Sequence, residues 1–342
     1  MNVLFVLGAF QKDRPQRWAN KHKVFFNLEE SLSKLGVHSL FYCNRLSLKK
    51  KFVRDSNQYF FDEDRDIRDV ILENNISVVF IWGGRTEADF YLKNRIPKQV
   101  KVVYGESGWF PQSGSCYFSP FGTNASANFL QEGFCDFILD RRRFLKLRKK
   151  LLKSWLGYWS SKPELDIDNS VTFSEGSIFV PLQDEQDTNI LLSSPFQKMS
   201  DFISFLALKY PKRQFIVRPH PRASYDTLPR FNNVKYQKTE DDPYKSYKDY
   251  AGIIGINSTM LMQFSLIGLP VIGIGEGVAK GCKGYIELSK DELPDELDEL
   301  SFDYKDMAKF YDFLLSYKQL RVSKLSSLSY LKSSYIPELL GL

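Results

Sequence analysis

Polar side chains that could do chemistry follow three apolar runs in the second half of the chain. The first run ends in Gln183 and Asp187, the second in Arg218, His220 and Arg222, and the third in Asn257, Ser258 and Thr259. An apolar, β-branched run that ends in polar residues is typical of a buried parallel strand, which delivers functional groups to the carboxyl edge of a sheet. Three such strand ends in succession predict one binding face.

The second group has the chemistry of an anion site. Pro219 and Pro221 restrict the backbone on both sides of His220, so the imidazole and the two flanking arginines should leave the strand in a stiff, extended segment. Positive groups held in this way suit a phosphate. Histidine beside proline also occurs in ordinary turns, and the HPR sequence alone is a weak signal.

The third group precedes a predicted helix. The run MLMQFSLIG at 260–268 has helical spacing, so Ser258 or Thr259 is placed to cap it, and the N–H groups at its start would face a bound anion. Taken alone, NST is more typical of a plain N-cap. The order of the three groups on consecutive strand ends is what favours a nucleotide-sugar site.

The motifs together carry a family resemblance. PLQ with DTNI, then RPHPR, then NSTMLMQFSLIGLPVIGIG resemble the capsule-polysaccharide biosynthesis family of bacterial glycosyltransferases, which includes the retaining β-Kdo transferases that use CMP-Kdo. The chain is similar, more distantly, to the GT-B bacterial sialyltransferases, whose marks are an acidic-acidic-glycine motif, an HP motif and a Ser/Thr pair. GESGWFPQ at 105–112 corresponds to the first mark, His220 with Pro221 to the second, and Ser258 with Thr259 to the third. The resemblance covers 100–125 and 175–280.

The resemblance implies two catalytic carboxylates. Asp187 matches the aspartate that follows PLQ in the Kdo transferases and becomes the candidate nucleophile, with Glu106 as partner acid or base. Only one acid comes from the GESG motif, because Ser107 follows Glu106. Departure of CMP from a 2-keto sugar acid develops oxocarbenium character that one carboxylate can stabilise or trap, while a second carboxyl handles the acceptor proton. On local sequence alone, Asp187 could equally cap a helix that begins at Thr188.

The resemblance also implies a set of donor-binding residues, with His220 expected in catalysis as well. The expected donor-binding residues are Gln183, Arg218, His220, Arg222, Asn257, Ser258 and Thr259. The weaker motif GIGEG at 273–277 follows a strand and imitates a dinucleotide loop, and it leaves a close backbone approach to the nucleotide open.

Length and patterning predict a soluble α/β enzyme with two domains. The chain has 342 residues, of which 43% are hydrophobic and 26% charged, and strand and helix patterns alternate along it. The expected fold is GT-B-like, with two Rossmann-like domains whose parallel sheets face a central cleft. The expected parts are a first domain at 1–159, a linker at 160–170, a nucleotide-sugar domain at 171–303, and a helical tail at 304–342 that returns to the first domain.

A basic run lies between the two halves. In DRRRFLKLRKKLLKSWLGYW at 140–159, eight arginines and lysines are interleaved with apolar residues, so a helix here would be basic and amphipathic. Such a helix is typical of contact with an anionic membrane surface, and equally of a surface helix that packs its leucines on its own domain. Without this run the chain is close to neutral, so the net charge of +6 does not indicate a nucleic-acid partner.

The expected location is the cytoplasm, at the inner face of the membrane if the acceptor is lipid-linked. Four dispersed cysteines indicate a reducing compartment, and the amino-terminal run MNVLFVLGAFQKDR predicts a strand instead of a signal peptide or membrane span. No cofactor or metal is expected, since the DID sequence at 166–168 falls in the linker and the CMP-activated acidic sugar is a substrate.

The sequence thus predicts transfer of an acidic sugar, with Kdo as first candidate, from CMP to a glycan or lipid-linked acceptor. The alternatives are a sialyltransferase-like or other nonulosonate transferase, and a non-catalytic sugar-binding or assembly subunit of a capsule system. The last would keep the HP and NST motifs while losing its carboxylates. Because Glu106 and Asp187 are both present, the enzyme is favoured.

Overall fold

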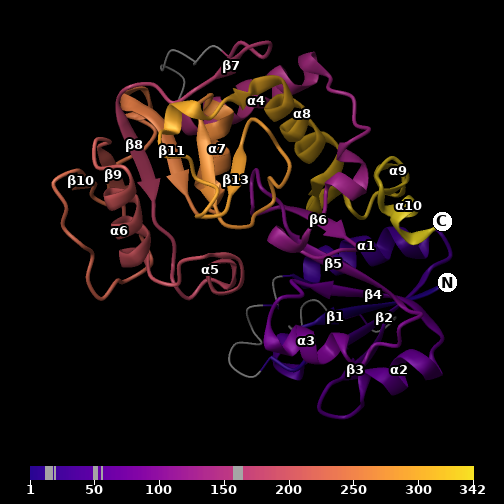
Figure 1. Cartoon of the computed structure of the whole chain (residues 1–342). Helices are drawn as coiled ribbons and strands as arrows, with labels where there is room; N and C mark the ends of the chain where they lie inside the picture. The colour runs from indigo at the N-terminus through magenta and orange to yellow at the C-terminus, as the bar shows by residue number, and fades with distance from the viewer. Residues whose placement is uncertain (12–17, 19–20, 49–52, 55–56, 157–164) are drawn as a thin grey trace. The chain divides into compact units, whose positions relative to one another are not determined.

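The chain folds into two compact units of α/β structure. The computed structural model describes residues 1–11, 18, 21–48, 53–54, 57–156 and 165–342. Unit 1 consists of 1–127 and 315–342, and unit 2 of 128–314 (Figure 1).

Unit 1 is built on a seven-stranded sheet with the order β15-β6-β5-β4-β1-β2-β3. Its strands are β1 (Asn2–Leu7), β2 (His38–Cys43), β3 (Gln58–Phe61), β4 (Ile76–Trp82), β5 (Lys101–Ser107), β6 (Ser115–Ser119) and β15 (Leu320–Arg321). The first five pair in parallel, while β6 and β15 are antiparallel additions at one edge. The central strands read as continuous apolar runs because both faces of the sheet are covered.

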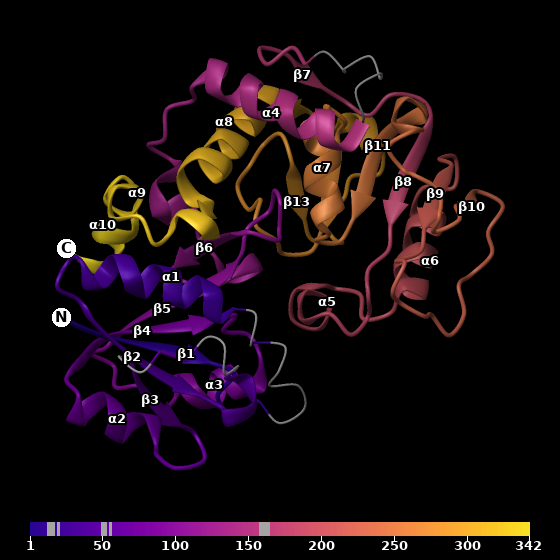
Figure 2. The same cartoon turned by 180° about the vertical axis from the view of Figure 1, so that it is seen from behind.

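Helices cover the two faces of this sheet separately (Figure 2). Helices α1 (His22–Ser33), α9 (Leu328–Lys332) and α10 (Ile336–Leu340) share one apolar core with alternate strand residues such as Phe5 and Phe80. Helix α2 (Ile67–Glu73) and Leu92 of α3 (Glu87–Lys93) share the other core with the intervening residues of the same strands.

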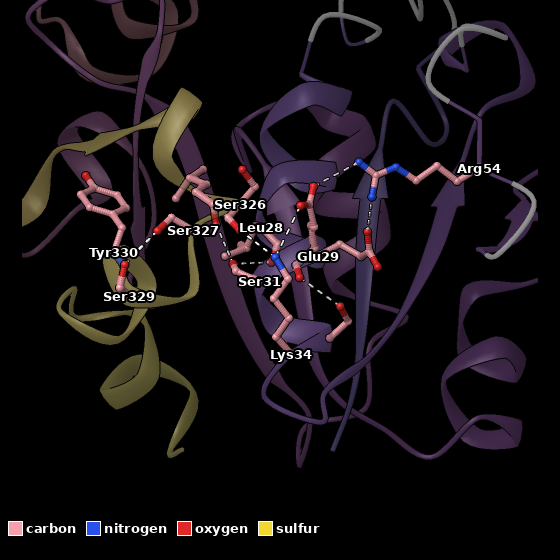
Figure 3. Close-up of polar contacts among 12 residues, drawn as sticks. Leu28, Glu29, Ser31, Lys34, Arg54, Ser326, Ser327, Ser329 and Tyr330 are labelled. Carbon is pink, nitrogen blue, oxygen red and sulfur yellow. Dashed lines mark hydrogen bonds and ion pairs between the residues drawn. The ribbon is translucent and has the colours of Figure 1, made fainter.

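The end of the chain is tied to unit 1 through α1. The Ser31 hydroxyl donates to the carbonyl of Leu325 at 2.6 Å, and the Lys34 ammonium donates to the carbonyl of Ser326 at 3.3 Å (Figure 3). Earlier in α1, Glu29 pairs with Arg54 at 3.0 Å. The expected tail, 304–342, is therefore divided, because only its part from 315 onward belongs to unit 1.

Unit 2 is built on a six-stranded parallel sheet with the order β10-β9-β8-β11-β12-β13. Its strands are β8 (Ser177–Pro181), β9 (Phe215–Arg218), β10 (Val234–Tyr236), β11 (Tyr250–Gly255), β12 (Val271–Ile274) and β13 (Ile286–Leu288), with a separate pair β7 (Ser170–Val171) and β14 (Phe302–Asp303). Numbered from β8, this is the order 3-2-1-4-5-6 of a Rossmann sheet, whose direction of winding reverses between β8 and β11.

The helices of unit 2 pack their apolar residues on this sheet and on one another. They are α4 (Arg141–Leu156), α5 (Thr188–Ser193), α6 (Met199–Lys209), α7 (Thr259–Ile267) and α8 (Tyr304–Asp312). Phe264 of α7 lies over Phe179 of β8, with ring centroids 5.3 Å apart, and Phe179 stacks on Tyr250 at 4.8 Å. The expected fold class, α/β with Rossmann-like units of parallel strands, is confirmed.

The division between the units differs from the expected domain boundary at residue 159. Helix α4 contacts α7 and α8, so 128–156 packs with unit 2 and not with the first domain. The reason is that Phe144 and Leu152 of α4 are fully buried in unit 2, a tertiary preference that local composition does not report. Positions 157–159 of the basic run and 160–164 of the linker lie outside the described residues. In the part of the chain that is described, no helix is both long and apolar enough to span a membrane.

Candidate functional site

The ends of the three motif-bearing strands are neighbours at the carboxyl edge of the unit 2 sheet. Strand β8 lies between β9 and β11, so the loops after all three leave the same edge side by side. The winding reverses between β8 and β11, and in open α/β sheets the loops diverge at such a point and leave a place for a ligand. The sequence therefore predicted correctly that these three strand ends come together.

A reciprocal amide pair joins the loops after β8 and β11. Gln183 Nε2 donates to Asn257 Oδ1 at 2.8 Å, and the backbone N–H of Asn257 donates to Gln183 Oε1 at 3.0 Å. Asn257 Nδ2 also donates to the carbonyls of Asn189 and Glu276, at 3.1 and 3.3 Å. Both side chains thus hold neighbouring loops together at the point where the winding of the sheet reverses. In this structure their role is to position those loops.

A tyrosine that the sequence did not suggest fixes the His220 turn. The Tyr225 hydroxyl accepts the backbone N–H of His220 and donates to the carbonyl of Gln183, both at 3.0 Å. The backbone N–H of Arg222 donates to His220 Nδ1 at 3.3 Å. In a neutral imidazole this places the hydrogen on Nε2, which becomes the donor of the ring. The only sequence signal was a tyrosine in the short polar segment after RPHPR.

The two arginines of this motif have different surroundings. Arg218 Nη2 donates to the carbonyl of Thr239 at 2.7 Å, in the loop after β10, while its Nε is buried without a hydrogen-bond partner. Arg222 is exposed. Arg222 is therefore the more exposed of the two, since Arg218 is part-buried.

Ser258 is the N-cap of α7. Its hydroxyl accepts the N–H of Met260 at 3.2 Å and its carbonyl accepts the N–H of Leu261 at 3.0 Å. Thr259 is the first residue of the helix. The capping interpretation of NST is therefore confirmed, and direct contact of these residues with a donor stays a prediction.

Asp187 likewise caps a helix. Its Oδ1 accepts the N–H of Asn189 at 2.8 Å at the start of α5, and the residue is exposed. Glu185 in the same loop accepts the N–H of Met199 and pairs with Lys198 at 2.9 Å. Because a carboxylate that accepts one N–H keeps further lone pairs, the cap does not remove the nucleophile hypothesis.

The GIGEG loop after β12 is occupied by a carboxylate of its own unit. Glu287 of β13 accepts the N–H groups of Gly277 and Ala279 at 3.0 and 2.9 Å, and a Cβ at position 277 would lie 2.5 Å from its Oε1. The N–H groups of Gly277 and Ala279, which a dinucleotide loop would direct at phosphate, are thus taken by Glu287. Burial raises the pKa of Glu287 to about 7, against the opposing effect of the two N–H donors.

Glu287 should make the stability of unit 2 depend on pH. Because its pKa is about 7 in the folded chain and near 4.5 when unfolded, the folded state binds the extra proton between these values. Its contribution is fully present below about pH 4.5 and is lost as the pH rises through 7, by about 3 kcal/mol in all. Glu287→Gln, measured by urea unfolding from pH 4.5 to 8, should gain stability relative to the parent as pH rises. Glu175→Gln, a change at an exposed acid elsewhere in unit 2, should not, and a Glu287→Gln difference independent of pH would contradict the assignment.

Glu106 belongs to unit 1, whereas the other candidate residues belong to unit 2. It lies near the end of β5 opposite Tyr117 of β6, and its Oε1 accepts the N–H of Ser107 at 2.7 Å. Beside it, the Lys21 ammonium donates to the Ser107 hydroxyl at 2.7 Å and lies 4.6 Å from the centre of the Trp82 ring. The carboxyl edge of the unit 1 sheet therefore combines a carboxylate with a cation.

The two aromatic residues that follow this motif are buried. Trp109 and Phe110 are 6% and 7% exposed, and Trp109 stacks on Tyr117 with ring centroids 4.6 Å apart. Gln319 accepts the N–H groups of both residues at 2.7 and 2.9 Å and donates to the carbonyl of Phe110 at 2.8 Å. These contacts make the GESGWF segment a packed loop, held from the carboxyl-terminal part of the chain.

Comparison with known proteins adds information on the fold. No family model matches the chain. It is 28% identical over 207 residues to Protein FixF of Sinorhizobium fredii, a match that covers 58% of this chain and 48% of FixF, so the chain spans about half the length of that curated relative.

Two solved structures resemble most of the chain. The β-Kdo 2,7 transferase of Thermosulfurimonas dismutans KpsC has a TM-score of 0.56 at 14% identity, covering 97% of this chain and all of the other. The β-Kdo 2,4 transferase of the same KpsC has a TM-score of 0.50 at 14% identity, covering 90% of this chain and 89% of the other. The chain therefore shares its GT-B-like fold with these two Kdo transferases, in agreement with the resemblance drawn from its motifs.

Proposed function

We propose that this protein is a GT-B glycosyltransferase that moves an acidic sugar, with Kdo as first candidate, from its CMP donor to a glycan or glycolipid acceptor in bacterial surface polysaccharide synthesis. The observation that carries the proposal is the meeting of the PLQ, HP and NST motifs on adjacent strands at the reversal point of one sheet. The fold that the chain shares with Kdo transferases supports it.

The proposed donor site is divided between residues that contact the donor and residues that position them. His220 Nε2 and the Arg222 guanidinium would hold the phosphate or the sugar carboxylate, and Ser258 with Thr259 would lie against phosphate or cytidine. Arg218 would contribute through the loop after β10, to which it is bonded. Gln183, Asn257 and Tyr225 would keep the three loops in register through the bonds described above.

The proposed chemistry uses two carboxylates. Asp187 would attack the anomeric carbon as the bond to CMP breaks, giving a sugar ester of the enzyme and free CMP. The acceptor hydroxyl would then attack the same carbon and release the Asp187 carboxylate, while Glu106 takes the hydroxyl proton. The proposal needs no metal ion, because Arg222 would balance the phosphate charge while His220 Nε2 donates a hydrogen bond to it. The proposed location is the cytoplasm, at the inner face of the membrane.

CMP should stabilise the protein more than UMP, UDP or GDP do. A ligand that binds only the folded state raises its stability by mass action, by about 2.7 kcal/mol at a concentration a hundred times its Kd. Thermal unfolding of the full chain with each nucleotide measures this. His220→Ala should keep the unliganded Tm and weaken CMP binding about tenfold or more, since it removes a hydrogen bond to a charged group.

The matched control is His38→Ala, an exposed histidine at the start of β2 in unit 1, which should leave CMP binding unchanged. Stabilisation by UDP or GDP and not by CMP would overturn the donor assignment. A folded His220→Ala variant with parental CMP affinity would make His220 a structural residue of its turn.

A further inference from the structure

Some basic residues of α4 bond to other residues of unit 2, and others are exposed to solvent. Three of them are used within unit 2. Arg141 pairs with Asp168 at 2.8 Å, Arg143 makes two bonds of 2.7 Å to the buried carboxylate of Asp312, and Arg148, 6% exposed, donates to two carbonyls at the end of α7. The remaining basic residues of the helix are exposed: Arg142, Lys146, Lys149, Lys150 and Lys153.

These five exposed residues, called here the basic face, lie along one side of α4. Counted from Arg142 they recur at i+4, i+7, i+8 and i+11, which is the spacing of a single helical face. The helix contains no acidic residue in its sixteen positions. The face therefore presents five like charges along about three turns of helix, a concentration of positive potential that a single ion pair cannot neutralise.

The opposite side of α4 is buried, and the helix packs on α7 and α8 of unit 2. Phe144 and Leu152 are 0% and 1% exposed, and α4 runs beside α8 in both views (Figures 1 and 2). Their side chains are not available to enter a bilayer while the unit is folded. Among the residues of this region whose exposure the structure describes, Leu145 is 43% exposed on the margin of the basic face and Ile138 is 85% exposed just before the helix.

We propose that the basic face docks unit 2 on an anionic lipid surface, with α4 lying on the headgroups instead of inserting among the acyl chains. The charge complementarity is that of a juxtamembrane polybasic segment, in which each basic residue near the surface strengthens binding about fivefold. The inference stands on the surface of α4 and does not depend on the donor site.

Sedimentation of the full chain with vesicles tests this docking. The protein should bind vesicles of equimolar phosphatidylglycerol and phosphatidylcholine, and it should not bind phosphatidylcholine alone. Binding should weaken strongly in high salt, because the Debye length falls from about 10 Å at 0.1 M to about 3 Å at 1 M. The triple variant Lys146→Glu, Lys149→Glu, Lys150→Glu should lose about a hundredfold or more in affinity, while Leu145→Ala should change it little.

A matched triple variant shows whether vesicle binding depends on the basic face itself or only on the net charge of the protein. Lys212→Glu, Lys235→Glu, Lys290→Glu changes three exposed lysines of unit 2 that lie outside α4, and it alters the net charge equally. It should keep most of the vesicle affinity. An equal loss in both triple variants, parental binding by the α4 variant, or binding to a soluble acidic glycan without binding to vesicles would overturn the proposal. CMP binding by each variant, measured separately, shows whether the donor site is intact, so failure of docking and failure of the proposed function are told apart.

Discussion

Asp187→Asn should abolish sugar transfer, lowering kcat by about a thousandfold or more, while donor binding and stability stay near those of the parent. The amide keeps the shape of the side chain and loses the attacking charge. It also keeps the cap on α5, since its oxygen can still accept the N–H of Asn189 and asparagine is as good an N-cap as aspartate. The steady-state rate of transfer from the CMP-sugar measures the loss of catalysis. Equilibrium binding of the same donor shows whether affinity is kept.

Asp184 offers a control in the same loop. Its Oδ1 accepts the N–H of Gln186 at 3.0 Å, so Asp184→Asn removes an equal charge from a similar local turn. It should transfer sugar at close to the parental rate. Mass spectrometry of the parent, incubated with donor under slowed acceptor attack, should detect a sugar adduct on the peptide that contains Asp187. Full activity in Asp187→Asn would leave this residue as a helix cap alone.

Glu106→Gln should lower the transfer rate about a hundredfold to ten-thousandfold, the range for a lost general acid or base. The glutamine oxygen can still accept the N–H of Ser107, so the end of β5 should keep its local geometry. Because Glu106 would take the proton of the acceptor hydroxyl after CMP has left, part of the lost rate should return with an acceptor whose hydroxyl is more acidic, or at higher pH. Donor binding should be unaffected.

The exposed acid Glu87, in the first turn of α3, provides the comparison in unit 1, and Glu87→Gln should be fully active. A defect in Glu106→Gln that appears only as weaker donor binding would exclude the proton-transfer role. A protein that binds CMP and is indifferent to both the Asp187 and Glu106 substitutions would be the non-catalytic subunit that the sequence left open.

The elements that hold the donor motifs could be predicted because each is local and strongly patterned. The apolar runs that became β8 and β11 are buried on both faces, while the residues of β9 alternate between buried and part-buried. All three appear in the sequence as hydrophobic segments that end in polar residues. The cap of α7 by Ser258 follows from one residue and its neighbours. The role of the basic run could be predicted only as two alternatives, since its composition suits both a membrane contact and a packed surface helix.

The sequence by itself determined the α/β class and the proximity of three motif ends, because hydrophobic periodicity is encoded within a few residues and the ends of neighbouring parallel strands meet at one edge of a sheet. Only the tertiary structure decided what surrounds each side chain. Tyr225 donates to the carbonyl of Gln183, 42 positions earlier, and Gln319 accepts the N–H of Trp109, 210 positions earlier. Glu287 of β13 accepts the N–H of Gly277 in the loop after β12. Contacts between residues so far apart leave no periodicity in the chain, since their partners are brought together only when the sheets and their covering helices pack.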